Sequence, residues 1–224
     1  MYFCNGPDFY SMEVITMTEW EKMVSGQLYN SEADALKELR LRCKRLCHTC
    51  NHLSPDQDEE RTALLRQLLG KTGEHFHIEP TFWCDYGKNI SLGEYFYSNH
   101  NLVILDCAPV TFGDHVLVAP NCGFYTAGHP LDAPTRNAAL EYAKPITVGD
   151  DVWIGGNVTV LPGVTIGSNV VIGAGSVVVH DIPSHVVAVG NPCRPIKTLE
   201  APVNSAPASF AGDSAFSCGC TTHS

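Results

Sequence analysis

The sequence predicts a mainly β protein, a parallel β-helix with an α-helical cap at its N-terminal end. Two observations predict the β-helix. From position 146 onward a small or apolar residue recurs at every sixth position, and glycine recurs at a fixed offset within that repeat. Short strands joined by tight turns, three to a triangular coil, produce such a period. The repeated positions are Ile146, Val152, Val158, Val164, Val170, Ser176 and Ile182, with Gly149, Gly155, Gly167 and Gly173 at the offset.

An earlier run keeps the same step of six and then shifts by two residues. It comprises Ile78, Cys84, Ile90, Phe96 and Leu102, followed by Val110, Val116 and Cys122. We expect residues 18 positions apart, such as Ile146, Val164 and Ile182, to stack inside, with coils about 4.8 Å apart. A β-sandwich is the alternative, but its turns recur about every 8 to 12 residues and its strands alternate with period two. A strict period of six matches neither.

Helix-length apolar spacing in residues 15–77 predicts the helical cap. Thr18 followed by Glu21 is a capping-box pattern, and Gly26 is a stop for the first helix. The second helix is expected to begin at the cap Ser31. Its apolar face carries Leu36, Leu39, Cys43, Leu46 and Cys47.

A third helix is expected with Ser54 as its cap, Pro55 at its first helical position and Gly70 just beyond Leu69. The β-helix then occupies residues 78–200. Within it, residues 129–145 break the repeat with three prolines and several charges, so we expect a loop that projects from a corner.

The two chain ends fall outside these patterns. Residues 1–14 form an N-terminal extension to which no function is assigned. Residues 201–224 contain no lysine or arginine and are rich in Ala, Ser, Gly and Thr, which predicts a disordered tail. Cys218 and Cys220 in that tail are predicted to be an unpaired, non-functional pair, a local disulfide being the alternative.

The ten cysteines are scattered through the apolar pattern, so we expect reduced thiols. Cys43, Cys47 and Cys50 cluster beside His48 and His52, which invites a metal-site interpretation. Their spacing equally continues the apolar face of the second helix. We favour buried packing cysteines and expect no metal at these three residues.

The charge balance excludes one class of partner. Charged residues make up 17% of the chain and the formal net charge is -10, so no basic surface is available to neutralise a phosphate backbone. The first residues lack the basic and apolar regions of a signal peptide, and no stretch approaches about 20 consecutive apolar residues. We expect a soluble, cytoplasmic protein that binds neither nucleic acid nor membrane.

Several short sequence motifs resemble those of the maltose and galactoside O-acetyltransferases, and the similarity runs from about residue 17 to 197. The motifs are Glu21-Lys22-Met23, Gly26-Gln27-Leu28-Tyr29, Cys84-Asp85-Tyr86-Gly87, Ala127-Gly128-His129-Pro130 and Gly190-Asn191-Pro192. The resemblance implies a left-handed coil and a homotrimer with active sites between subunits. It also implies acetyl-CoA as cosubstrate, a sugar hydroxyl as the attacking group and no metal.

The same resemblance makes His129 the catalytic base. A hydroxyl attacks a thioester poorly until its proton begins to leave, and histidine titrates near neutral pH. Asn99 matches an asparagine that orients the attacking oxygen. Glu141 is expected to hydrogen-bond His129 and stabilise the imidazolium. Arg40, Asp85 and Tyr97 match further acceptor-site positions.

The cofactor assignments follow from the resemblance as well. Trp153 matches an indole that walls the groove, and Gly156 and Ala174 match positions along which the pantetheine arm runs. Arg194 and Lys197 match a basic pair that meets the nucleotide phosphates.

Two departures concern the ligands. Val179 and His180 replace a Thr-Lys pair, which is expected to weaken CoA binding and make it pH-dependent. Cys107 replaces a second aspartate of the galactoside enzymes, so the acceptor is the least specified ligand. An acetyltransferase acting on a non-carbohydrate alcohol or amine is the alternative function, and a non-catalytic scaffold is the remote one.

Overall fold

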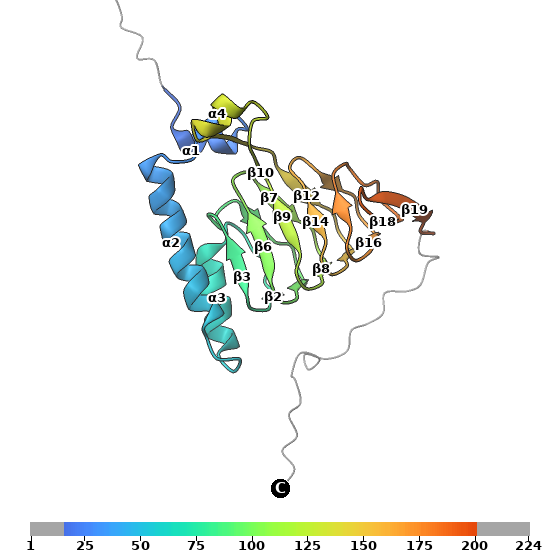
Figure 1. Ribbon diagram of the computed structural model, residues 1–224. Helices are drawn as coiled ribbons and strands as arrows, with labels where there is room; N and C mark the ends of the chain where they lie inside the picture. The colour runs from blue at the N-terminus through green and yellow to red at the C-terminus, as the bar shows by residue number, and fades with distance from the viewer. Residues whose placement is uncertain (1–15, 201–224) are drawn as a thin grey trace, which may run out of the picture.

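Strands of the β-helix stack in three sheets around a triangular core in the computed structural model, which describes residues 16–200 (Figure 1). The seven-stranded sheet holds β2 (Phe76–Ile78), β5 (Phe96–Ser98), β8 (Leu117–Val118), β13 (Val152–Ile154), β16 (Val170–Ile172), β18 (Val186–Val189) and, antiparallel at its end, β19 (Arg194–Thr198). The five-stranded sheet holds β3 (Phe82–Cys84), β6 (Leu102–Leu105), β9 (Gly123–Tyr125), β14 (Thr159–Val160) and β17 (Val177–Val178). The four-stranded sheet holds β4 (Ile90–Ser91), β7 (Val110–Phe112), β12 (Ile146–Val148) and β15 (Thr165–Ile166).

Side chains alternate between core and surface along most strands of the three sheets. In β12, Ile146 and Val148 are buried while Thr147 between them is exposed. Ile146 pairs with Val110, which pairs with Ile90, so like residues form columns inside the prism. The inward-facing residues of the three stacked sheets therefore add apolar area to one continuous core.

Asparagines make the tight corners that a short coil requires. Asn101, Asn121, Asn157 and Asn169 all have φ between 53° and 64°. This left-handed conformation is disfavoured for most residues, and asparagine tolerates it better than any other residue except glycine.

The register confirms the period of six in the C-terminal coils and corrects it elsewhere. Val152 pairs with Val170, 18 positions later, but Phe76 pairs with Phe96, 20 positions later. The last coil is shorter, because Ile182 bridges to Ile166. The expectation that Ile182 stacks on the residue 18 positions before it is therefore wrong.

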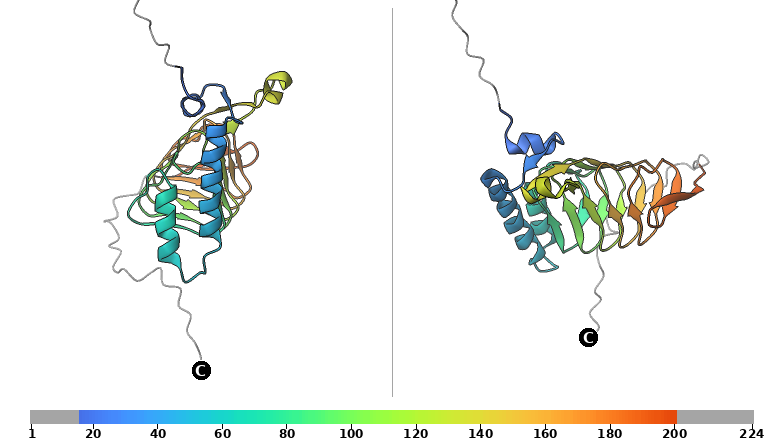
Figure 2. Two further views of the ribbon diagram at one scale, coloured as in Figure 1. Left: turned by 90° about the vertical axis from the view of Figure 1, so that its left-hand side faces the viewer. Right: turned by 45° about the horizontal axis from the view of Figure 1, so that its top comes forward.

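Helices α1 (Glu19–Val24), α2 (Asp34–Asn51) and α3 (Asp58–Leu68) form the cap. The helices α2 and α3 cover the open end of the β-helix next to β3 (Figure 2). Their apolar side chains join the same core as the coils. No helix within residues 16–200 is both long and apolar enough to cross a membrane.

The capping box of α1 is confirmed, but the predicted start of α2 is wrong. The Thr18 side chain accepts from the Glu21 N–H while Glu21 reaches back to the Thr18 N–H. Ser31 lies before α2 and donates its hydroxyl to the Ala139 carbonyl at 3.1 Å, so it is not available as a cap. The local pattern predicts that the Ser31 hydroxyl caps the helix, but this hydroxyl binds a backbone carbonyl far away in the sequence.

The predicted start of α3 is wrong as well. Ser54 and Pro55 lie in a turn, and the helix begins at Asp58, three residues beyond the expected proline. Acidic residues fill its first turn, where negative charge is favourable. The end is as expected, because Leu69 terminates the helix and Gly70 follows. A side chain at Gly70 would clash with the backbone carbonyl of residue 88.

The projecting loop has structure of its own. Strand β10 (Ala127–Gly128) leads into it, and it contains the short helix α4 (Ala133–Asn137) and β11 (Leu140–Ala143). Strand β11 pairs antiparallel with β10 on one side and with β1 (Tyr29–Asn30) of the cap on the other. Helix α4 projects away from the prism (Figure 2). The loop and the cap thus each contribute a strand to one three-stranded sheet, which the sequence pattern did not predict.

Candidate active site

One edge of the prism carries all the extra residues of the longer coils. This edge, which we call the loop edge, joins the five-stranded sheet to the four-stranded sheet. Asp85 follows β3, Cys107 follows β6, and the loop with His129 follows β9. Because β3, β6 and β9 are neighbours in register, these residues lie on successive coils of the same edge.

Asp106 organises this edge from inside. Its side chain is fully buried, and its Oδ1 accepts from the N–H groups of Asp85 at 3.0 Å and Tyr86 at 2.8 Å. Its Oδ2 accepts from the Asn89 N–H at 3.3 Å. Burial raises the pKa of Asp106 to about 6, against the lowering effect of these N–H donors. The carboxylate fixes the backbone that presents Asp85.

His129 lies at the start of the loop, beside Glu141. Its side chain is 60% exposed, and its Nδ1 lies 4.0 Å from Oε1 of Glu141. This separation suits an ion pair and exceeds a hydrogen bond. The other carboxylate oxygen of Glu141, Oε2, accepts from the Tyr29 hydroxyl at 2.7 Å. A histidine open to solvent thus faces a carboxylate that the cap holds in place.

Asp85 is surrounded by groups from three elements. The Cys107 thiol donates to Oδ2 of Asp85 at 3.5 Å. Burial raises the pKa of Asp85, and that hydrogen bond together with the nearby charge of Arg40 opposes the rise. Arg40 reaches in from α2, donating to the Tyr86 hydroxyl at 2.8 Å and to the Ser31 carbonyl at 2.6 Å. The loop edge therefore joins polar groups of cap, coils and loop.

The remaining acceptor-site candidates lie away from the loop edge. Asn99 follows β5, at the edge between the seven-stranded and five-stranded sheets, which we call the strand edge. Tyr97 faces outward from β5 and stacks on His77, with ring centroids 5.7 Å apart. Within the single chain, neither residue is brought to His129.

The groove candidates follow the strand edge. Trp153 projects from β13 and is 55% exposed, while Gly156 and Ala174 lie in the turns after β13 and β16. A Cβ at Gly156 would lie 3.3 Å from the Pro120 carbonyl oxygen, so this turn is closely packed. Small residues leave the backbone of this edge accessible to a ligand.

The basic candidates lie further along the prism. Arg194 and Lys197 are exposed on β19, at the C-terminal end of the seven-stranded sheet. Val179 and His180 follow β17, so they lie on the loop edge. The proposed cofactor residues are therefore divided between both edges.

Comparison with known proteins identifies the family. Residues 22–73 match the maltose acetyltransferase hexapeptide capping motif, and residues 145–180 match the bacterial transferase hexapeptide of six repeats. The galactoside O-acetyltransferase of Escherichia coli (strain K12) is 44% identical over 185 residues, which cover 83% of this chain and 91% of that protein. The chain belongs to the maltose/galactoside O-acetyltransferase family.

Solved structures of maltose/galactoside O-acetyltransferases agree with this fold. A maltose O-acetyltransferase from Clostridium difficile 630 has a TM-score of 0.82 at 50% identity, covering 83% of this chain and 99% of that one. A galactoside acetyltransferase in complex with coenzyme A has a TM-score of 0.80 at 44% identity, covering 83% and 92%. This protein is accordingly an acyltransferase built on a hexapeptide-repeat β-helix.

Sequence reasoning gave no role to three side chains that shape the loop edge of this family member. They are Tyr29, which binds Glu141, Tyr86, which binds Arg40, and Asp106, which holds the turn. Tyr29 and Tyr86 both belong to sequence motifs that carried the family resemblance. Their place in these motifs was the signal that could have identified them, because neither residue has a local pattern of its own.

Proposed function

We propose that this protein transfers the acetyl group of acetyl-CoA to a hydroxyl of a sugar, with His129 as general base. The observation that carries the proposal is an exposed imidazole whose Nδ1 faces Glu141 at 4.0 Å. The carboxylate stabilises the imidazolium that forms when the base takes a proton. The maltose and galactoside relatives support the acceptor class, and the relative in complex with coenzyme A supports the cosubstrate.

The reaction needs one proton to move twice. Because Nδ1 faces Glu141, Nε2 of His129 is the atom that takes the proton of the acceptor hydroxyl. The hydroxyl oxygen then bonds to the thioester carbonyl carbon, and collapse of the tetrahedral intermediate breaks the carbon–sulfur bond. The imidazolium returns the proton to the departing CoA sulfur. The products are an O-acetyl ester and the CoA thiol.

A homotrimer completes this site in our proposal. The base lies on the loop edge, whereas Asn99 lies on the strand edge and Trp153 projects from β13 of the adjoining seven-stranded sheet. Packing three prisms around a threefold axis sets the loop edge of one subunit against the strand edge of its neighbour. Each groove then combines His129 of one chain with Asn99 of another.

Acetyl-CoA lies along this groove in the proposal. The indole of Trp153 forms one wall, and the backbone at Gly156 and Ala174 receives the pantetheine arm. Arg194 and Lys197 meet the phosphates. Val179 and His180 face the same ligand from the loop edge, and His180 contributes charge only when it is protonated.

The residues proposed to bind the acceptor differ from those of the galactoside relatives at one position, Cys107. The Cys107 thiol donates to Asp85, where an aspartate in the galactoside enzymes offers a sugar hydroxyl a hydrogen-bond acceptor. This difference keeps a non-carbohydrate alcohol or amine as the second candidate acceptor. A scaffold without catalysis would require neither His129 nor its carboxylate partner.

Thiol release from acetyl-CoA tests the proposal across maltose, glucose, galactosides, aminosugars and simple alcohols. Release with a sugar, together with an O-acetyl product identified by mass spectrometry, is the expected result. Release only with amines or simple alcohols would establish the second candidate. Absence of release with every acceptor, in protein that binds CoA, would contradict both.

A further inference from the structure

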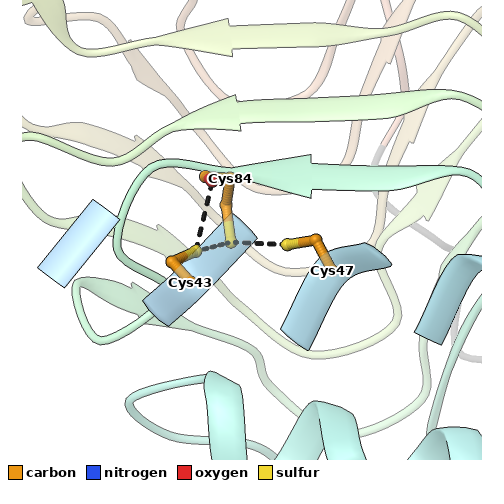
Figure 3. Close-up of side chains that lie close together, drawn as sticks. All are labelled: Cys43, Cys47 and Cys84. Atoms are coloured by element: carbon orange, nitrogen blue, oxygen red, sulfur yellow. Dashed lines mark hydrogen bonds between the residues drawn. The ribbon is translucent and has the colours of Figure 1, made fainter. Parts of the chain in front are cut away.

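Three buried thiols converge where the cap packs against the β-helix. Cys43 and Cys47 lie one turn apart on the same face of α2, and Cys84 ends β3, which α2 covers (Figure 3). Sγ of Cys84 lies 3.5 Å from Sγ of Cys43 and 3.9 Å from Sγ of Cys47. All three sulfur atoms lie within 4.8 Å of one another.

These separations match three sulfur ligands around one metal ion. A metal–thiolate bond is about 2.3 Å long, which places the sulfurs of a trigonal planar site about 4.0 Å apart. The separations of 3.5 Å and 3.9 Å are within about half an ångström of that value. They are far longer than the roughly 2.05 Å of a disulfide, so the thiols are free to act as ligands.

The number of ligands selects the metal. Among residues 16–200 no further Cys, His, Asp or Glu joins the three sulfurs. Cys50 is buried on the same helix but outside the group, and His48 stacks on His52 at the exposed surface with centroids 4.1 Å apart. Structural zinc requires four ligands, whereas Cu(I) is a soft ion that prefers sulfur and accepts three.

A surface pocket borders one member of the cluster. A pocket of about 390 Å³ between α2, α3 and the first coil includes Cys43, Leu46 and Leu68 in its lining. The lining is largely apolar, and its charged members are the cations Arg42 and Lys88. A small soft cation can approach Cys43 by this route, while the bulk of the core excludes water from the other two sulfurs.

We propose that Cys43, Cys47 and Cys84 form a three-coordinate site for Cu(I) that joins the cap to the β-helix. The ion forms three copper–sulfur bonds without changing its oxidation state, and protons displaced from thiols pass to solvent. The family resemblance implied no metal at all, and the separate expectation for the helix cysteines considered Cys43, Cys47 and Cys50 alone. It did not include Cys84, which is 37 positions from Cys47 in the sequence.

Anaerobic titration of the full chain with Cu(I), supplied as its acetonitrile complex in competition with bicinchoninate, tests the site. Cys4, Cys218 and Cys220 are first replaced by serine, because the tail pair can itself bind a soft metal. The expected result is one Cu(I) per chain and a higher melting temperature. X-ray absorption should show three sulfurs at about 2.3 Å.

Substitutions locate the ion. Loss of an outer-shell partner already weakens metal sites by about 10- to 100-fold, so Cys47→Ser or Cys84→Ser should weaken binding by at least about 100-fold. Cys50→Ser is the matched control, since it alters a buried cysteine of the same helix and should leave affinity unchanged. Circular dichroism and the acetyl-transfer rate check that each variant is folded.

Three results would overturn the proposal. They are a parent protein that takes no Cu(I) from bicinchoninate, a Cys47→Ser variant that binds as tightly as Cys50→Ser, and an absorption spectrum with two sulfur neighbours. The spectrum is taken on the protein with its cluster intact, so the test stands even if a cluster variant fails to fold.

Discussion

The Tyr29 hydroxyl donates a hydrogen bond of 2.7 Å to Oε2 of Glu141 across the paired strands β1 and β11. Burial raises the pKa of that hydroxyl, so it remains a donor wherever the protein is folded. Through this bond the cap fixes the carboxylate that faces His129. Tyr29 is therefore a positioning residue in the proposed mechanism.

Tyr29→Phe should lower kcat about tenfold and leave KM for acetyl-CoA nearly unchanged. The substitution leaves Oε2 of Glu141 without its donor and lets the carboxylate turn from His129, which weakens stabilisation of the imidazolium. The matched control is Tyr95→Phe, at an exposed tyrosine of a corner. Steady-state kinetics measure both variants.

A double-variant cycle separates this role from simple destabilisation. Glu141→Gln alone should reduce kcat, and Tyr29→Phe should then add little, because the two residues act as one unit. Fully additive losses would show that Tyr29 acts independently of Glu141.

His129→Ala should reduce turnover by at least about 100-fold, since general-base catalysis contributes about 10²- to 10⁴-fold. Binding of acetyl-CoA, measured by calorimetry, should barely change, because the proposed groove residues lie elsewhere. His52→Ala, at an exposed histidine of the cap, is the control. A purified His129→Ala protein that binds acetyl-CoA and keeps more than about a tenth of wild-type activity would place the base at another residue.

Mixed trimers test the proposed assembly. His129→Ala and Asn99→Ala proteins should each have little activity. Random trimers from an equal mixture should recover about a quarter of wild-type activity, because a groove between neighbours is intact when each supplies its unaltered edge. Activity of the unfolded and refolded mixture, with mass by light scattering, gives the answer. No recovery in verified mixed trimers would mean that both residues act from the same chain.

Asp106→Asn should change how stability depends on pH. The folded-state pKa of Asp106 is about 6, raised from 3.8 by burial. A raised carboxyl pKa means that the folded state binds the proton more tightly, so wild-type stability falls as pH rises from about 4 to 6. The wild-type advantage over Asp106→Asn should shrink across that window by up to about 3 kcal/mol. Melting curves of both proteins at several pH values measure it, and a constant or growing advantage would contradict the assignment.

Short-range signals were reliable where one residue type serves one local purpose. The period of six located the strands from β12 to β16, and Thr18 with Glu21 predicted the start of α1. Ser31 failed as a cap because its hydroxyl binds Ala139, 108 positions away. No local pattern contains a partner at that distance.

The candidate site shows the same limit. The family resemblance indicated His129 and Glu141. The contact of Glu141 with Tyr29, however, spans 112 positions and depends on the pairing of β1 with β11. The two edges of the prism could be told apart only from the strand register. Coil length changes from 20 to 18 residues along the chain, so a fixed period misplaces some residues.

The antiparallel strand β19 has a consequence for solubility. A stack of parallel coils ends in unpaired backbone groups, onto which another chain can add as a further coil. In the seven-stranded sheet, β19 occupies that position with Pro195, which has no N–H to donate, and with the charges of Arg194 and Lys197. Proline and charge on an edge strand discourage end-to-end growth. Replacing this strand would expose the outer edge of β18 in the seven-stranded sheet to pairing with another chain.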